Sequence, residues 1–184
     1  MVLLFLADGF EEIEALTPAD ILRRAGVDVK TVSVGKERGQ LVTGSHGIGV
    51  CPDMTADDAK KAGIKPDAVI LPGGMPGAEN LDADPTVDTF VKDAYSAGKI
   101  VAAICAAPMI PGKRGMLDGK RATCFPGFEE YLTGAVVTGG RVETDGNMIT
   151  ACGMGASTEF ALAIVKALKG EGAAQKLHDA ILAK

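Results

Sequence analysis

The stretch Lys99-Ile100-Val101-Ala102-Ala103-Ile104-Cys105-Ala106-Ala107-Pro108 places a cysteine directly after a short apolar run. The run has the length of a strand that is buried on both faces of a sheet. The alanines and the proline after Cys105 are typical of the first turn of a helix. We therefore expect Cys105 on a sharp strand-to-helix turn, at the sheet edge where open α/β folds bind ligands. This is the arrangement of a nucleophile elbow, with sulfur in place of the usual serine.

The expected helix also bears on the reactivity of this cysteine. A helix N-terminus favours a thiolate, because its dipole and free N–H groups stabilise negative charge, so we predict a lowered pKa for Cys105. The other cysteines, Cys51, Cys124 and Cys152, have no such context and are interpreted as small, mostly buried apolar side chains. Their spacing, in a chain with two histidines, is not that of a zinc site, so no metal is predicted.

The composition is typical of a compact globular protein. Of the 184 residues, 47% are hydrophobic, and the net charge of −5 supplies no basic surface for nucleic acid or anionic lipid. The first apolar run, residues 2–6, is too short to span a bilayer and is not preceded by a charged leader. We therefore expect one domain, residues 1–184, in the cytoplasm, with neither nucleic acid nor membrane as a partner.

Strand patterns alternate with helical patterns along the chain. Buried strands are expected at residues 2–6, 27–34, 68–71 and 100–104, and the longer helices at 11–24, 84–97, 157–169 and 173–182. Residues 41–43 and 47–51 are expected to form a short antiparallel pair. In the first helix, the expected apolar face consists of Ile13, Leu16, Ile21 and Leu22. This alternation predicts an α/β fold with a mainly parallel sheet and helices on both faces.

In such a sheet, the loops after residues 2–6, 68–71 and 100–104 meet at one edge. Backbone N–H groups of Gly73 and Gly74, together with that of Ala106, are candidates for holding the oxygen of an adduct formed on Cys105. Glu14 lies near the start of the first helix. Ionised, it would repel a thiolate; protonated, it can donate a hydrogen bond to sulfur or move a substrate proton. Sequence spacing alone does not decide whether Glu14 is a site residue or a surface residue, whereas Glu11 and Glu12 are interpreted as surface residues.

Several segments together resemble the ThiJ/PfpI superfamily, in the branch that contains the parkinsonism-associated deglycase and the bacterial YajL-like proteins. They are GFEEIEA (9–15), DILRRAG (20–26), CPD (51–53), VILPGGMPGAENL (69–81), VAAICAAP (101–108) and EFALAIV (159–165). The resemblance covers nearly the whole chain. It implies a flavodoxin-like sandwich, usually a homodimer, with a redox-sensitive nucleophilic cysteine and no bound cofactor.

The resemblance also assigns roles to individual positions. Cys105 matches the reactive cysteine and Glu14 its protonated partner. Gly74 and Ala106 match the backbone oxyanion donors, and Arg24 matches an arginine near the dimer interface and the mouth of the site.

Three positions depart from relatives. Ala106 stands where the protease-like branch has a histidine, which removes the base of a Cys-His dyad. Phe125 stands where deglycases often have a histidine, as in YajL-like members. His46 replaces a site-adjacent arginine of many relatives, and is either a site contact or a solvated loop histidine. The candidates for substrate binding are Gly73, Arg24, His46 and Phe125.

Two functions are compatible with these residues. The first is a cofactor-independent, glutathione-independent glyoxalase or deglycase that acts on small aldehydes such as methylglyoxal, or on their early adducts. In it, Cys105 forms a hemithioacetal and Glu14 shuttles protons. The alternative is a redox-sensing or chaperone protein whose Cys105 oxidises to a sulfinate. A cysteine amidase or peptidase is the least favoured, because of Ala106.

Overall fold

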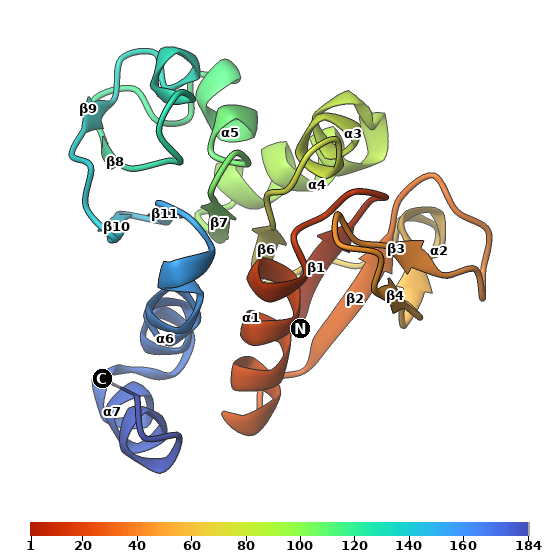
Figure 1. The fold of residues 1–184 in the computed structure, drawn as a ribbon, viewed down its shortest axis with the longest axis horizontal. Helices are drawn as coiled ribbons and strands as arrows, with labels where there is room; N and C mark the ends of the chain where they lie inside the picture. Colours follow the sequence, from red (N-terminus) through yellow and green to blue (C-terminus); the bar gives the residue numbers. More distant parts are fainter. Residues whose placement is uncertain (184) are drawn as a thin grey trace.

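The computed structural model describes residues 1–183, and its centre is a seven-stranded sheet (Figure 1). The strand order is β10-β11-β7-β6-β1-β2-β5. The bounds are β1 (Val2–Leu6), β2 (Val29–Ser33), β5 (Met54–Thr55), β6 (Ala68–Leu71), β7 (Ile100–Ile104), β10 (Val142–Asp145) and β11 (Met148–Ala151). Neighbouring strands pair in parallel, except that β10 is antiparallel to β11. The predicted mainly parallel sheet is therefore confirmed.

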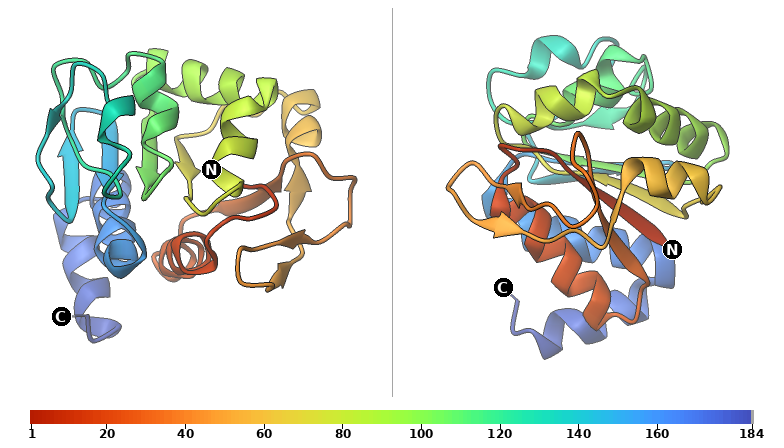
Figure 2. Two further views of the ribbon diagram at one scale, coloured as in Figure 1. Left: turned by 45° about the horizontal axis from the view of Figure 1, so that its top comes forward. Right: turned by 90° about the vertical axis from the view of Figure 1, so that its right-hand side faces the viewer.

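Helices cover both faces of this sheet, which Figure 2 shows edge-on in its right-hand view. One face carries α2 (Ala56–Lys61), α3 (Gly77–Ala83), α4 (Pro85–Ser96) and α5 (Met109–Lys113). The other carries α1 (Glu12–Arg24) and α6 (Ser157–Lys169), with α7 (Glu171–Ala180) packed on α6. Alternation along β1 fills both cores, because Leu3 and Phe5 face the first layer while Leu4 faces the second.

Smaller elements decorate this sandwich. The predicted antiparallel pair is present as β3 (Val42–Thr43) and β4 (Gly49–Val50). A second pair, β8 (Arg121–Ala122) and β9 (Val136–Val137), is parallel. Two short 3₁₀ turns, η1 (Glu129–Tyr131) and η2 (Met154–Ala156), complete the chain. Within residues 1–183, no helix is both long and apolar enough to cross a membrane.

The expected apolar face of α1 is partly wrong. Ile13 and Leu16 are 48% and 37% exposed, whereas Ala15, Ala19 and Leu22 are buried. Residues 15, 19 and 22 recur at the helical spacing of four and three, so they define one stripe, and residues 13 and 16 lie outside it. Two alanines supply much of this stripe, so a search for large apolar residues wrongly included Ile13 and Leu16, although the expected Ile21 and Leu22 are buried.

Candidate active site

The predicted sharp turn at Cys105 is present. Its φ of +65° lies in the left-handed region, which residues other than glycine seldom adopt. Its N–H donates to the Ala151 carbonyl at 2.8 Å, and its carbonyl accepts from the Phe125 N–H at 2.8 Å. These two bonds hold Cys105 between the end of β11 and the chain after β8, and so fix the elbow from both sides.

The helix expected directly behind Cys105 is displaced. The chain continues through turns to Pro108, and α5 begins only at Met109 and has five residues. A short helix that starts four residues away provides little dipole stabilisation, because that effect is confined to the first turn. Burial raises the pKa of Cys105 to about 12, and the charge of Glu14 adds to the rise. The prediction of a lowered thiol pKa is therefore wrong.

Glu14 lies in this site, not on the surface. Its side chain is 1% exposed, and its Oε2 accepts the N–H of Gly73 at 2.9 Å. Its carboxyl group also hydrogen-bonds the Cys105 thiol, and burial raises its pKa to about 7. A Cβ placed on Gly73 would lie 2.7 Å from Glu14 Oε2 and 2.8 Å from Cys105 Cβ. The three residues thus converge, and glycine at 73 leaves the space in which they do so.

The Gly73-Gly74 loop is tied to the start of α1. The Glu11 N–H donates to the Gly73 carbonyl at 2.9 Å. Gly74 has a φ of +84°, and a Cβ there would lie 2.5 Å from the Gly9 carbonyl oxygen. Any larger residue at 74 would therefore separate the loop from the segment that carries Glu14.

Two backbone donors face the sulfur. The N–H groups of Ala106 and Gly74 hydrogen-bond Cys105 and partly offset the burial that raises its pKa. The N–H of Gly73, by contrast, is taken by Glu14 and is not available to a substrate. When the shared proton resides on Glu14, the thiolate has three donors: two N–H groups and the carboxyl O–H. This arrangement can hold one negative charge on sulfur and move one proton.

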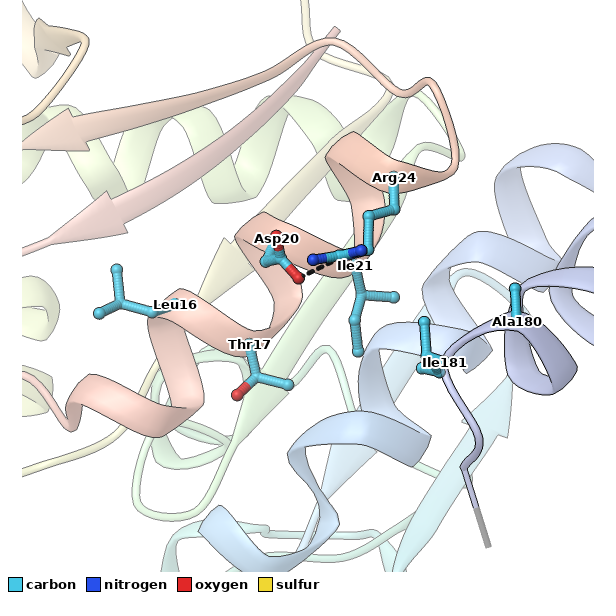
Figure 3. A pocket seen from close by; sticks show the side chains of 7 residues that line it. All are labelled: Leu16, Thr17, Asp20, Ile21, Arg24, Ala180 and Ile181. Atoms are coloured by element: carbon cyan, nitrogen blue, oxygen red, sulfur yellow. Dashed lines mark hydrogen bonds and ion pairs between the residues drawn. The ribbon is translucent and has the colours of Figure 1, made fainter.

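The remaining predicted residues lie at different distances from this centre. Phe125 is adjacent, since its N–H bonds the Cys105 carbonyl, and its side chain is 48% exposed. Arg24 lies ten residues after Glu14 on α1, about 15 Å along the helix axis. Its Nε donates to Asp20 at 2.6 Å, and it lines a groove of about 550 Å³ between α1 and α7 (Figure 3). Within this chain, Arg24 is not part of the cluster around Cys105.

His46 meets Glu12 instead of Cys105. Its backbone N–H and its Nδ1 lie 2.8 Å and 2.9 Å from the two Glu12 oxygens. Glu12 is 4% exposed, which corrects its interpretation as a surface residue. Burial opposes ionisation, but hydrogen bonds from His46 and from the backbone outweigh it and lower the pKa of Glu12 to about 2. A Cβ on Gly44 would collide with this carboxylate, so glycine there allows the β3–β4 hairpin to close on α1.

Glu11 completes a small group with these two residues. Ligand atoms of Glu11, Glu12 and His46 lie within 4.8 Å of one another, which is the spacing of a cation site. The Glu12 oxygens are, however, already occupied by the hairpin: Oε1 accepts the N–H groups of His46 and Ile48, and Oε2 faces the Ser45 hydroxyl and His46 Nδ1. We therefore interpret the group as the attachment of the hairpin to α1. The two glutamates and His46 were visible in the sequence, but only the docked hairpin brings them together.

This attachment predicts a pH-dependent contribution to stability. At neutral pH, Glu12→Gln should lower the free energy of unfolding by about 1–3 kcal/mol, because buried donors lose an ionised acceptor. A carboxyl whose folded pKa is about 2 stabilises the fold above its unfolded pKa, near 4.3, and this contribution disappears as the pH falls toward 2. Urea unfolding of both proteins should therefore give a difference that shrinks in acid. Glu130→Gln, at an exposed position, is the matched control and should change little.

Known proteins with similar sequences place this chain, with its cysteine elbow in an α/β fold, in one family. The sequence profile of the DJ-1/PfpI family matches residues 1–167. The chain is 38% identical over 186 residues to the Parkinson disease protein 7 homolog of Danio rerio, covering 99% of this chain and 96% of the relative. It is 33% identical over 151 residues to a deglycase of Pyrococcus horikoshii, covering 81% and 87%. The chain belongs to the DJ-1/PfpI family.

Solved structures agree with this assignment. A mutant of a DJ-1 superfamily protein from Salmonella typhimurium superposes with a TM-score of 0.91 at 35% identity, covering 98% of this chain and 97% of the other. A Toxoplasma gondii DJ-1, described as oxidized, also gives 0.91, at 33% identity and with the same coverage. The predicted superfamily and fold class are therefore confirmed.

Proposed function

We propose that this chain is a cofactor-independent enzyme that converts methylglyoxal-like aldehydes, or their early adducts with amines and thiols, without glutathione. The observation that carries the proposal is the Cys105 sulfur held between a carboxyl group whose pKa burial raises to about 7 and two backbone N–H donors. Both histidines lie elsewhere, His46 against Glu12 and His178 on α7, so proton transfer falls to Glu14. The deglycase among the relatives supports this substrate class.

The chemistry follows from where the proton starts. Ionised Glu14 first takes the proton of the Cys105 thiol; the thiolate then attacks the aldehyde carbon and a C–S bond forms, while the carbonyl electrons move to oxygen. The N–H groups of Gly74 and Ala106 no longer face a charged sulfur, so they can hold the developing oxyanion. Glu14 then protonates this oxygen and completes the hemithioacetal.

Isomerisation uses the same carboxyl group. Ionised Glu14 takes the proton from the former aldehyde carbon and returns it to the neighbouring carbon of the enediolate, while the hydroxyl proton of the former aldehyde carbon passes to the neighbouring oxygen. The product is a thioester on Cys105, which water hydrolyses to lactate and the free thiol. The net reaction is methylglyoxal plus water to lactate and one proton, which is released to solvent, and each group returns to its starting state.

Direct assay tests this proposal. Purified protein is mixed with excess methylglyoxal in the absence of glutathione, and lactate is followed by proton NMR. We expect many lactate molecules per protein molecule. Loss of methylglyoxal that stops at one equivalent per protein, without lactate, would contradict catalysis and would identify a trapping thiol.

A redox role is the second candidate, favoured by the oxidized state of the Toxoplasma gondii relative. In this role, peroxide converts Cys105 to a sulfinate, which protonated Glu14 stabilises by a hydrogen bond. Selective gain of two oxygen atoms on Cys105 after mild peroxide, with negligible lactate formation, would favour this role over catalysis. A peptidase stays least favoured, because Ala106 offers no base.

We further propose a cytoplasmic homodimer that buries the outer face of α1. Ile13 and Leu16 are partly exposed on α1, and Leu16 lines the groove between α1 and α7 (Figure 3). Exposed large apolar residues gathered on one helix are typical of an interface. Sedimentation equilibrium should give twice the chain mass for the wild type and the chain mass for Leu16→Glu. Lys61→Glu, at an exposed position on α2, should remain dimeric, and a monomeric wild type would refute the proposal.

A further inference from the structure

The sheet register places a second cysteine beside Cys105. Strands β7 and β11 are parallel neighbours, and their last paired residues are Ile104 and Ala151. Cys105 and Cys152 come next on the two strands, and the Cys105 N–H still bonds the Ala151 carbonyl at 2.8 Å. Neighbouring strands lie about 4.8 Å apart. That separation, which holds for the paired residues Ile104 and Ala151 one position earlier, lies inside the range of about 4.4–6.8 Å between the Cα atoms of a disulfide.

Both of these cysteines also face the same layer. Cys105 and Cys152 pack against the apolar cluster between the sheet and the pair α1 and α6. In a regular strand, successive side chains point to opposite faces of the sheet. Because Ile104 and Ala151 face this cluster, regular strands would direct the side chains of Cys105 and Cys152 to the opposite face. The positive φ of Cys105 breaks the alternation on β7, and β11 has ended before Cys152. The two departures from strand geometry bring both side chains to one side.

Access distinguishes this pair from the other two cysteines. Cys105 and Cys152 are half-buried and Cys124 is buried, whereas Cys51 is exposed beyond β4, which corrects the expectation that it is a buried apolar side chain. Cys152 borders a cavity of about 390 Å³ whose wall also includes Phe125, Met154 and the buried Cys124, so burial and strand register, not the cavity, distinguish Cys152 from Cys124. Small oxidants and reductants in solution can therefore reach Cys152 through this cavity, and they reach Cys105 through its own partly exposed side.

We propose that Cys105 and Cys152 form a reversible intramolecular disulfide when a peroxide oxidises Cys105. The Cys105 thiolate attacks one oxygen of hydrogen peroxide, the O–O bond breaks, and a sulfenic acid forms, while the leaving hydroxide takes the proton from Glu14 and departs as water. The Cys152 thiolate then attacks the Cys105 sulfur, the S–O bond breaks, and hydroxide leaves and takes up a proton as a second water. The two thiols lose two electrons in total, and the peroxide gains them.

The disulfide requires one movement. The Cys105 sulfur now faces Glu14 and the Gly74 N–H, on the β6 side of β7, and β11 lies on the other side. Rotation about the Cα–Cβ bond of Cys105 carries the sulfur from the first position to the second. The bond then removes the thiol from its donors and protects it from further oxidation to sulfinate, so Cys152 acts as a resolving cysteine. This inference goes beyond the proposed function and does not depend on aldehyde turnover.

Peptide mapping tests it directly. Cleavage after lysine and arginine places each of the four cysteines in a different peptide, Cys105 in residues 100–113 and Cys152 in residues 142–166. Dilute protein is treated with a slight excess of hydrogen peroxide, free thiols are alkylated, and the digest is analysed by mass spectrometry without reduction. We expect the peptides 100–113 and 142–166 joined, two hydrogen masses below their sum, in a species of monomer mass on a non-reducing denaturing gel. A thiol reductant should restore both free peptides.

The matched variant is Cys152→Ser, with Cys124→Ser as the control for thiol number. Cys152→Ser should lack the joined peptide, accumulate a sulfenic acid that a dimedone probe traps, and then gain sulfinate on Cys105 faster than the wild type. Cys124→Ser should behave as the wild type. Equal sulfinate yields in the wild type and Cys152→Ser would overturn the proposal, as would a cross-link found only between chains. The mass readout stands even for a protein that produces no lactate, so failure of the proposed enzyme and failure of this disulfide are distinguishable.

Discussion

Replacing Cys105 with serine is expected to lower kcat/KM for methylglyoxal by on the order of 10³-fold or more, as removal of a catalytic nucleophile does. A serine hydroxyl is a weaker acid and a weaker nucleophile than a thiol, so the same carboxylate generates far less reactive oxygen than it does sulfur. The N–H groups of Gly74 and Ala106 remain, but nothing forms the C–S bond whose oxyanion they would hold. Lactate formation followed by NMR measures the loss.

The control for this loss is Cys51→Ser, because that thiol is exposed and lies outside the cluster. It should keep wild-type turnover and show that removing a cysteine elsewhere does not affect the reaction. Unfolding curves of Cys105→Ser should stay close to those of the wild type, since the substitution keeps the size and the backbone of the elbow. Lactate turnover that persists in Cys105→Ser would refute nucleophilic catalysis by this residue.

The parts of the site that the sequence predicted are those set by local pattern and by the edge of a parallel sheet. The apolar run before Cys105 fixes β7, and the short run before Gly73 fixes β6. Because the strands are parallel, both turns lie at one edge of the sheet, and the first turn of α1 lies at the same edge. The position of Glu14 beside the sulfur follows from this topology, although spacing alone left it open.

The parts that the sequence did not predict depend on how separate elements dock. Glu12 meets His46 only because the β3–β4 hairpin closes over the start of α1. Cys152 lies beside Cys105 only because β11 is the neighbour of β7 in the sheet. No local sequence motif predicts this strand order. The pKa of Cys105 was predicted in the wrong direction, because burial and the charge of Glu14 exceed the dipole of a helix that starts too late.

The Glu14–Cys105 pair makes the second large prediction, a change in pH dependence. Burial raises the pKa of Glu14 to about 7 and that of Cys105 to about 12, so the pair holds one proton between these limits. Below about pH 7 it takes up a second proton, and both the thiol and the carboxyl become neutral. No thiolate is then available, and kcat/KM of the wild type should rise with pH through about 7.

Glu14→Gln should remove this rise and lower kcat/KM by about 10²–10⁴-fold, the usual range for loss of a general acid–base. Glutamine keeps the volume of the side chain, and its amide oxygen can still accept the Gly73 N–H, so packing does not explain the loss. Glu11→Gln is the informative control, because the Glu11 charge, a smaller cause than burial, also raises the pKa of Glu14. It should keep the maximal rate and move the rise to lower pH. If Glu14→Gln keeps the wild-type rate and profile, the proton is carried by water, and Glu14 only shapes the pocket around the sulfur.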